Sequence, residues 1–381
     1  MKQTIVGRRP QDGLPIEVIV EDGLVHAIQE GHHDQDLWLA PGLIDLQVNG
    51  YGGDDVNCES PDPETIISLT RRMLALGVTT YLPTIITTSE AKVTAALRAV
   101  AEARRRSKLV ADMVPCVHVE GPSISSSDGP RGAHPLEHVR PPDLSEFLRW
   151  QAASDGLVGM VTLSPHFDGV ERYIATLASE GVHVAIGHTD ATPEQIHRAV
   201  DAGATLSTHL GNGSAGLIPR HSNVLWPQLA DDRLTATLIA DGHHLPDDML
   251  KTILRAKGIA RSILVSDSVA LAGMPPGCYE TPVGGRVELN DKGRLSLAGT
   301  EFLAGAARSL KDGVTHAVSC ASISLFEGLR MATENPGRFV GGLGILRVGA
   351  PADLIRFAIE PDSSSLCIET AMVKGREWRD G

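Results

Sequence analysis

His188 and His209 are the two residues whose spacing most clearly suggests chemistry, because each follows a short apolar run. Between them, Thr192 and Pro193 indicate an N-cap and the first position of a helix, and Gly203 indicates its end. The stretch therefore predicts a strand–helix–strand unit. Both histidines would then leave the same edge of a parallel sheet, about 5–10 Å apart for strands spaced by about 4.8 Å. Such a spacing suits two ligands of one metal ion.

Two carboxylates end other predicted strands and extend this set. Glu120 ends one strand and Asp267 ends another. A single histidine at a strand end is more often an ordinary hydrogen-bonded residue than a ligand. Glu120, His188 and His209 together, however, form a set of two histidines and one carboxylate. That set suits Zn²⁺ with an open position for water, and it also accepts Fe²⁺, Mn²⁺ or Co²⁺. Asp267 would face that water as the proton acceptor.

No lysine lies at a predicted strand end. A carbamylated lysine bridging two metals is therefore excluded, and we expect one divalent ion per chain.

The order of elements predicts a (β/α)₈ barrel of the TIM type. Eight strand–helix repeats over roughly 300 residues exceed the count of an ordinary doubly wound sheet, and no Gly-rich dinucleotide turn follows the first strand. In a barrel the chemistry lies at the carboxyl ends of the strands. The expected strands are 43–49, 79–86, 113–120, 159–164, 182–188, 204–209, 235–240 and 262–267, with helices at 63–76, 89–106, 170–180, 192–202 and 246–257.

The two ends of the chain predict a second, smaller unit. Short alternating runs before residue 41 indicate β-strands, and the tail 344–355 returns to β patterning. We expect the ends to pair as a small discontinuous β-sandwich of residues 1–41 and 345–381, beside a barrel of residues 42–344. After the eighth strand, 284–296 alternates like a hairpin, and helices are expected around 301–318 and 320–333.

Composition narrows the classes of function. The chain has 381 residues, 42% of them hydrophobic, and a formal net charge of −13. This charge disfavours nucleic acids and anionic membrane surfaces as partners. No apolar run long enough to span a membrane is present. Five cysteines without a C-x-x-C pair suit reduced thiols in the cytoplasm.

Several motifs together resemble those of the amidohydrolase superfamily, and within it the group of N-acetylglucosamine-6-phosphate deacetylases. The motifs span nearly the whole chain and are Pro41–Gly50, His118–Pro122, Gly187–Thr192, Thr208–Asn212, Ile239–His244 and Ser266–Asp267 followed by Ala272–Gly273. The superfamily's first-strand H-x-H is Gln47-x-Asn49 here, as in the single-metal members of this group.

The resemblance implies a role for each matching residue. It makes Glu120, His188 and His209 the metal ligands and Asp267 the acid and base. It places His134 over the substrate carbonyl. His244, Asn212 and the backbone near Gly213 would surround the sugar phosphate, and Arg220 would reach the phosphate of a neighbouring subunit in a homodimer. The implied reaction is metal-dependent deacetylation of a small amino-sugar 6-phosphate in the cytoplasm.

One segment departs from the family pattern and leaves alternatives open. Residues 213–223 keep the distance from His209 to Arg220 but not the surrounding sequence. An amidohydrolase for a different N-acylated amino sugar or a cyclic amide would share the metal core without recognising a 6-phosphate. A sugar-phosphate sensor without catalysis is the alternative from another class of protein, but a sensor has no use for Asp267.

Overall fold

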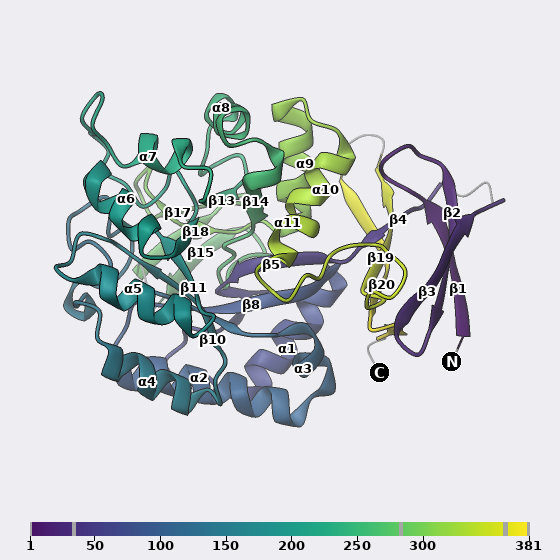
Figure 1. The fold of residues 1–381 in the computed structure, drawn as a ribbon, viewed down its shortest axis with the longest axis horizontal. Helices are drawn as coiled ribbons and strands as arrows, with labels where there is room; N and C mark the ends of the chain where they lie inside the picture. Colours follow the sequence, from purple (N-terminus) through teal and green to yellow (C-terminus); the bar gives the residue numbers. More distant parts are fainter. Residues whose placement is uncertain (1, 33–35, 282–284, 361–364, 379–381) are drawn as a thin grey trace.

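The structure is a computed structural model that describes residues 2–32, 36–281, 285–360 and 365–378. A barrel of strands ringed by helices fills most of the molecule, and a β-rich unit lies at one side of it (Figure 1). The predicted fold class, a (β/α)₈ barrel with a separate β-rich domain, is confirmed. Within the described residues, no helix combines the length and apolarity needed to cross a membrane.

Eight parallel strands form the barrel, and the first and last of them meet. Val48 pairs in parallel with Ser268, and the backbone N–H of Asp267 donates to the carbonyl of Gln47 at 3.0 Å. The strands follow one another around the barrel in chain order: β5 (Leu43–Val48), β8 (Val78–Ile86), β9 (Val117–Glu120), β10 (Val158–Leu163), β11 (His183–Ile186), β12 (Ala204–Ser207), β13 (Thr235–Ile239) and β14 (Ser262–Val265).

Helices connect successive strands and cover the barrel with their apolar faces. In α6, Thr192 and Gln195 form a capping box and Pro193 starts the helix, while Ile196, Ala199 and Val200 are buried. The connecting helices are α1 (Pro63–Ala75), α2 (Glu90–Arg106), α3 (Lys108–Met113), α4 (Leu144–Ala153), α5 (Val170–Ser179), α6 (Pro193–Asp201), α7 (Leu225–Ala230) and α8 (Asp247–Lys257); α9 (Leu310–Ala321), α10 (Leu325–Met331) and α11 (Glu334–Gly337) follow the last strand, and short 3₁₀ turns lie at Leu136–His138 and Ile259–Arg261.

Both ends of the chain contribute to one seven-stranded sheet, as the tail pattern predicted. β19 pairs antiparallel with β4, which joins the C-terminal strands to the N-terminal ones (Figure 1). The order is β21 (Arg376–Glu377), β20 (Leu366–Val373), β19 (Leu354–Ile359), β4 (Trp38–Pro41), β1 (Lys2–Arg8), β2 (Pro15–Glu21) and β3 (Leu24–Glu30). The domain boundaries at 41/42 and 344/345 stay a prediction, and parts of the terminal segments lie outside the described residues.

A four-stranded antiparallel sheet after β14 was predicted only in part. The expected hairpin corresponds to β16 (Gly285–Leu289) and β17 (Arg294–Leu297), residue 284 lying outside the described residues. β15 (Gly277–Thr281) and β18 (Leu303–Ala306) flank that hairpin and were missed. A further small hairpin of β6 (Gly50–Tyr51) and β7 (Asp54–Asp55) follows the first barrel strand.

Four expected elements start at least four residues later than predicted or are interrupted. The helix expected from residue 301 starts at Leu310, because 303–306 pair with β17 as β18. The helix expected over 320–333 is interrupted by the left-handed Ser322, and α10 starts after the Ser324 capping box. The strand expected from 113 starts at Val117, because α3 occupies 108–113. The strand expected from 344 starts at Leu354, after a Gly- and Pro-containing stretch.

Candidate functional site

The predicted site residues meet at the carboxyl ends of the barrel strands. Glu120 is the last residue of β9, and His188, His209 and Asp267 each lie two residues beyond the end of their strand. These last three have positive φ angles of 48°, 30° and 49°. A left-handed backbone costs a residue with a side chain about 1–3 kcal/mol and is concentrated at functional sites. The same local backbone strain at three strand ends indicates that this edge of the barrel carries the functional site.

Three of these residues bring donor atoms to one point. Glu120 Oε1 lies 3.1 Å from His209 Nε2 and 3.3 Å from His188 Nε2, and the two imidazole nitrogens are 3.0 Å apart. A tetrahedral Zn²⁺ with bonds of about 2.0–2.2 Å would separate its ligand atoms by roughly 3.3 Å. The three residues therefore fit a divalent ion with little movement. All three side chains are buried at the base of the barrel opening, which holds their donor atoms in place.

Neighbouring groups orient these donors. His188 Nδ1 lies 2.9 Å from the carbonyl of Pro130 and donates to it, which leaves Nε2 as a lone-pair donor toward Glu120. Gln47 Nε2 donates to Glu120 Oε1 at 2.9 Å. Burial alone would raise the pKa of Glu120, but its contacts with His188 and His209 outweigh burial and hold that pKa well below its usual value. Glu120 is therefore a carboxylate at neutral pH.

Asp267 faces the same point and behaves differently. Asn49 Nδ2 donates to its Oδ1 at 2.8 Å, which fixes the carboxyl group. Burial, and then the negative charge of Glu120, raises the pKa of Asp267 to about 8. A divalent cation beside Asp267 would favour its ionised form. Glu120 is thus kept charged, and Asp267 can exchange a proton near neutral pH. Acid–base catalysis requires this division of roles.

His134 lies on the far side of the donor cluster. Its ring is 4.3 Å from that of His188, centroid to centroid, and its ligand nitrogen lies within 4.8 Å of those of Glu120 and His188. His209 lies closer to both, so distance favours His209 as the third ligand and leaves His134 facing the open position. Burial, then the nearby His188, lowers the pKa of His134 to about 3, so the ring is neutral. Its Nδ1 contacts the Thr87 hydroxyl at 2.8 Å.

A cavity of about 570 Å³ opens over this cluster. It is lined by all of the predicted residues except one: Glu120, His134, His188, His209, Asn212, Gly213, His244 and Asp267. Arg220 lies outside it, exposed on the segment between β12 and α7. None of the described residues that line the cavity is a lysine or an arginine. A phosphate bound there would need a cation from elsewhere.

Asp241 fixes the orientation of His244 at the cavity wall. One carboxylate oxygen accepts the backbone N–H groups of His243 and His244 at 2.8 Å each, and the other lies 2.7 Å from His244 Nδ1. Burial opposes ionisation of Asp241, but its contacts with His244 outweigh it and lower the pKa to about 2. The His244 imidazole therefore turns its Nε2 away from Asp241 and is held in one orientation.

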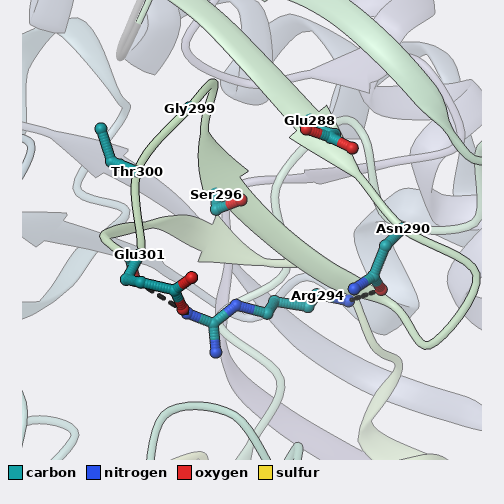
Figure 2. Close-up of a pocket in the computed structure, with 7 residues that line it drawn as sticks. All are labelled: Glu288, Asn290, Arg294, Ser296, Gly299, Thr300 and Glu301. Carbon is teal, nitrogen blue, oxygen red and sulfur yellow. Dashed lines mark hydrogen bonds and ion pairs between the residues drawn. The ribbon is translucent and has the colours of Figure 1, made fainter.

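A second hollow, of about 540 Å³, lies on the four-stranded sheet and holds none of the predicted site residues (Figure 2). Its one cationic lining residue is already paired, because Arg294 Nη2 donates to the carboxylate of Glu301 at 3.1 Å and to its carbonyl at 2.7 Å. Its arginine is engaged by Glu301, and the described residues that line the hollow include no histidine, cysteine or group of metal-ligating side chains like the one in the cavity.

Four supporting residues were not assigned a role from sequence. Gln47 and Asn49 were noted only as replacements for two histidines, yet they orient Glu120 and Asp267. Thr87 and Asp241 were given no role, although they contact His134 and His244. The position of Asp241 three residues before His244, just after an expected strand, was the one signal that pointed to such a contact.

Comparisons with known proteins give a consistent result. Residues 38–377 match the amidohydrolase family. The chain is 32% identical to an N-acetylglucosamine-6-phosphate deacetylase from Bacillus subtilis, covering 84% of this chain and 80% of that protein. It is 31% identical to an N-acetylgalactosamine-6-phosphate deacetylase from Escherichia coli O157:H7, covering 94% and 93%. An N-acetyl-D-glucosamine-6-phosphate deacetylase structure from Mycobacterium smegmatis superposes with a TM-score of 0.83 at 28% identity, covering 95% of each chain.

Proposed function

The chain belongs to the amidohydrolase family, and from that premise we propose that it hydrolyses N-acetyl-D-glucosamine 6-phosphate to D-glucosamine 6-phosphate and acetate. The observation that carries this proposal is the convergence of Glu120, His188 and His209 beside Asp267, in a cavity large enough for a sugar. Release of acetate from the phosphorylated sugar by the metal-loaded protein tests it.

Glu120, His188 and His209 would hold one divalent ion, and Zn²⁺ is our first choice for the donor set. Bound there, such an ion supplies a water whose pKa is lowered toward about 7 and polarises the acetyl carbonyl. Fe²⁺, Mn²⁺ and Co²⁺ suit the same donors. We expect one tightly held ion per chain. Gln47 and Asn49 occupy the two positions at which the superfamily has its first-strand H-x-H histidines, and they are hydrogen-bonded to Glu120 and Asp267 instead.

Asp267 would carry the proton through the reaction. It takes a proton from the attacking water, and it then gives that proton to the sugar nitrogen as the C–N bond breaks. The amine must leave neutral, because an amide anion is far too basic to depart. Asn49 keeps the carboxyl group pointed at the cavity during both transfers.

His134 would stabilise the negative charge that develops on the acetyl oxygen. A neutral imidazole has one N–H, so His134 can donate from Nε2 only if Nδ1 accepts the hydroxyl proton of Thr87. A donor in this position contributes about 2.7–4 kcal/mol to lowering the barrier. The low pKa of His134 ensures that the ring does not compete with the metal as a second cation.

Replacing Thr87 with valine is expected to lower kcat by about 10-fold, the effect of losing one orienting hydrogen bond of roughly 1–1.5 kcal/mol, with little change in KM. The valine keeps the shape of the side chain but cannot donate to His134 Nδ1. Thr87→Ser keeps the hydroxyl and should restore most of the rate. Steady-state kinetics on both variants measure the effect. A valine variant with the kcat of the wild type would mean that Thr87 does not set the tautomer of His134.

Recognition of the sugar would involve His244, Asn212 and the backbone at Gly213, which line the cavity beside the donor cluster. The C4 epimer, N-acetylgalactosamine 6-phosphate, is a second candidate substrate, because relatives named for either sugar are 31% identical to this chain. A substrate without a 6-phosphate is less favoured, because both kinds of relative are named for a phosphorylated sugar.

Arg220 would supply the phosphate-binding cation to the cavity of a second copy in a homodimer. The segment around it is exposed, Leu217 is 95% exposed, and Ile218 and Trp226 are also exposed. An apolar loop around an arginine suits a contact between subunits. The guanidinium can donate to two phosphate oxygens at once.

A cytoplasmic location is consistent with the five free thiols.

Arg220→Ala is expected to raise KM for the 6-phosphorylated sugar by at least about 10-fold, since a charged hydrogen bond is worth about 1.5–3 kcal/mol, and to leave an unphosphorylated analogue almost unchanged. Mixing this variant with Asp267→Asn should restore activity, because one site of each mixed dimer regains both residues. Equal losses on both substrates would contradict the phosphate role. No recovery after confirmed subunit exchange would place Arg220 in its own chain's site.

A further inference from the structure

Helix α8 packs against α9 on the outside of the barrel (Figure 1). A second group of side chains that could hold a metal ion lies between these helices, and none of its members lines the cavity. Asp247 is the first residue of α8, and His316 and Cys320 are four residues apart on α9. Residues spaced by four share one face of a helix, so the imidazole and the thiol point to the same place. One ligand atom from each of the three residues lies within 4.8 Å of the others.

His316 is held in the position a ligand needs. Its Nε2 is shielded from solvent and has no hydrogen-bond partner among the described residues, although Asp247 Oδ1 lies 3.1 Å away as an ion-pair contact. A buried polar nitrogen without a hydrogen bond is costly, and a cation between it and the carboxylate would remove that cost. The ring packs against Gly242, where an added Cβ would come within 3.1 Å of it. The cluster therefore lies behind the loop that carries His244.

The chemistry of the three donors selects a class of ion. A thiolate and an imidazole favour borderline or soft metals over Mg²⁺ and Ca²⁺. Burial, then the charge of Asp247, raises the pKa of the Cys320 thiol. Binding therefore displaces the thiol proton to solvent, and the thiolate and carboxylate charges together neutralise a divalent ion. This proton loss makes the cluster a weaker site than the buried one in the cavity.

We propose that Asp247, His316 and Cys320 form a second binding site for Zn²⁺ or a similar borderline divalent ion, with water completing the coordination. The proposal is independent of the reaction in the cavity. Asp247 is 66% exposed and can close on the ion from the solvent side, while the His316 side chain, 22% exposed, is already in place. The site would hold its ion next to Gly242 without contributing to the catalytic ligands.

Titration with Co²⁺ of protein that has been loaded with only one Zn²⁺ per chain, enough to fill the stronger site in the cavity, tests this proposal. A thiolate bound to Co²⁺ gives a near-ultraviolet charge-transfer absorption, and Glu120, His188 and His209 contain no sulfur. We expect the absorption to saturate at one added Co²⁺ per chain. It should disappear in Cys320→Ser and His316→Gln. Asp247→Asn, a change at an exposed position that the fold tolerates, should weaken Co²⁺ binding by at least about 10-fold, as for loss of a metal-supporting group.

Cys58→Ser is the matched control, because Cys58 is the thiol that lines the cavity. The absorption should be unchanged in this variant. An absorption that is lost in Cys58→Ser and kept in Cys320→Ser would overturn the proposal by placing the Co²⁺ in the cavity. So would the absence of any thiolate absorption in the wild type at saturating Co²⁺, or an unchanged affinity in Asp247→Asn.

Discussion

Replacing Asp267 with asparagine is expected to lower kcat by about 10²–10⁴-fold, the usual contribution of a general base, while the protein keeps its metal and still binds the sugar. The amide preserves the shape and can still accept the hydrogen bond from Asn49, but it cannot take up and return a proton. Metal content and steady-state kinetics measured on the same preparation separate the two properties. Asp55→Asn is the matched control, because Asp55 is another carboxyl lining the cavity. It should retain kcat within about 10-fold.

Although Asp267→Asn should lower kcat, it should raise the thermal stability of the metal-free protein. The pKa of Asp267 is raised from 3.8 to about 8 in the folded chain. Its favourable contribution is therefore fully present below about pH 4 and is lost as pH rises toward 8. An asparagine never ionises, so the chelated variant should melt at a higher temperature than the chelated wild type at pH 8, and the difference should shrink toward pH 4.

If Asp267→Asn kept more than about a tenth of the wild-type kcat, Asp267 would be only a structural cap.

Glu120→Gln is expected to remove the metal and, with it, nearly all activity. Glu120 is the one anionic member of the donor set, and the glutamine would present a neutral oxygen or an N–H to the ion. Loss of even an outer-shell partner costs about 10–100-fold in metal affinity, so loss of this ligand should exceed about 100-fold. Elemental analysis after dialysis, followed by assays with added Zn²⁺, measures both effects.

Glu280→Gln serves as the control for this change, because Glu280 also lines the cavity but is exposed and does not belong to the group of metal-ligating side chains. It should retain its ion and its rate. A Glu120→Gln protein that keeps one ion through dialysis, also when Cys320→Ser removes the second site, would contradict the ligand assignment. The contact of His134 with the cluster would then make His134 the natural replacement ligand to test.

Periodicity and strand-end position predicted most of what positions the site. The eight barrel strands follow from apolar runs separated by helices, and a closed barrel brings Glu120, His188, His209 and Asp267 to one edge without any knowledge of their contacts. The pairing of the tail with the N-terminal strands was likewise visible in the β pattern of both ends.

Contacts between side chains that are far apart in the chain could not be predicted from the sequence. Asn49 and Asp267 are 218 residues apart, and Gln47 and Glu120 are 73 apart, so no local pattern joins them. β15 and β18 flank a hairpin whose own alternating pattern was visible, but their pairing depends on that hairpin being in place. The helix expected from residue 301 failed for the same reason, because pairing with β17 overrides the local preference of 303–306.

The rate of acetate release from N-acetyl-D-glucosamine 6-phosphate, compared with that from unphosphorylated N-acetyl-D-glucosamine, tests the central claim most directly. The metal-loaded protein should release acetate from the phosphorylated sugar with a kcat/KM at least about 10-fold higher, as one charged hydrogen bond to the phosphate requires. Chelation should abolish the release, and Zn²⁺ should restore it. Equal rates on both sugars, or no acetate from the phosphorylated sugar with one ion bound per chain, would contradict the account.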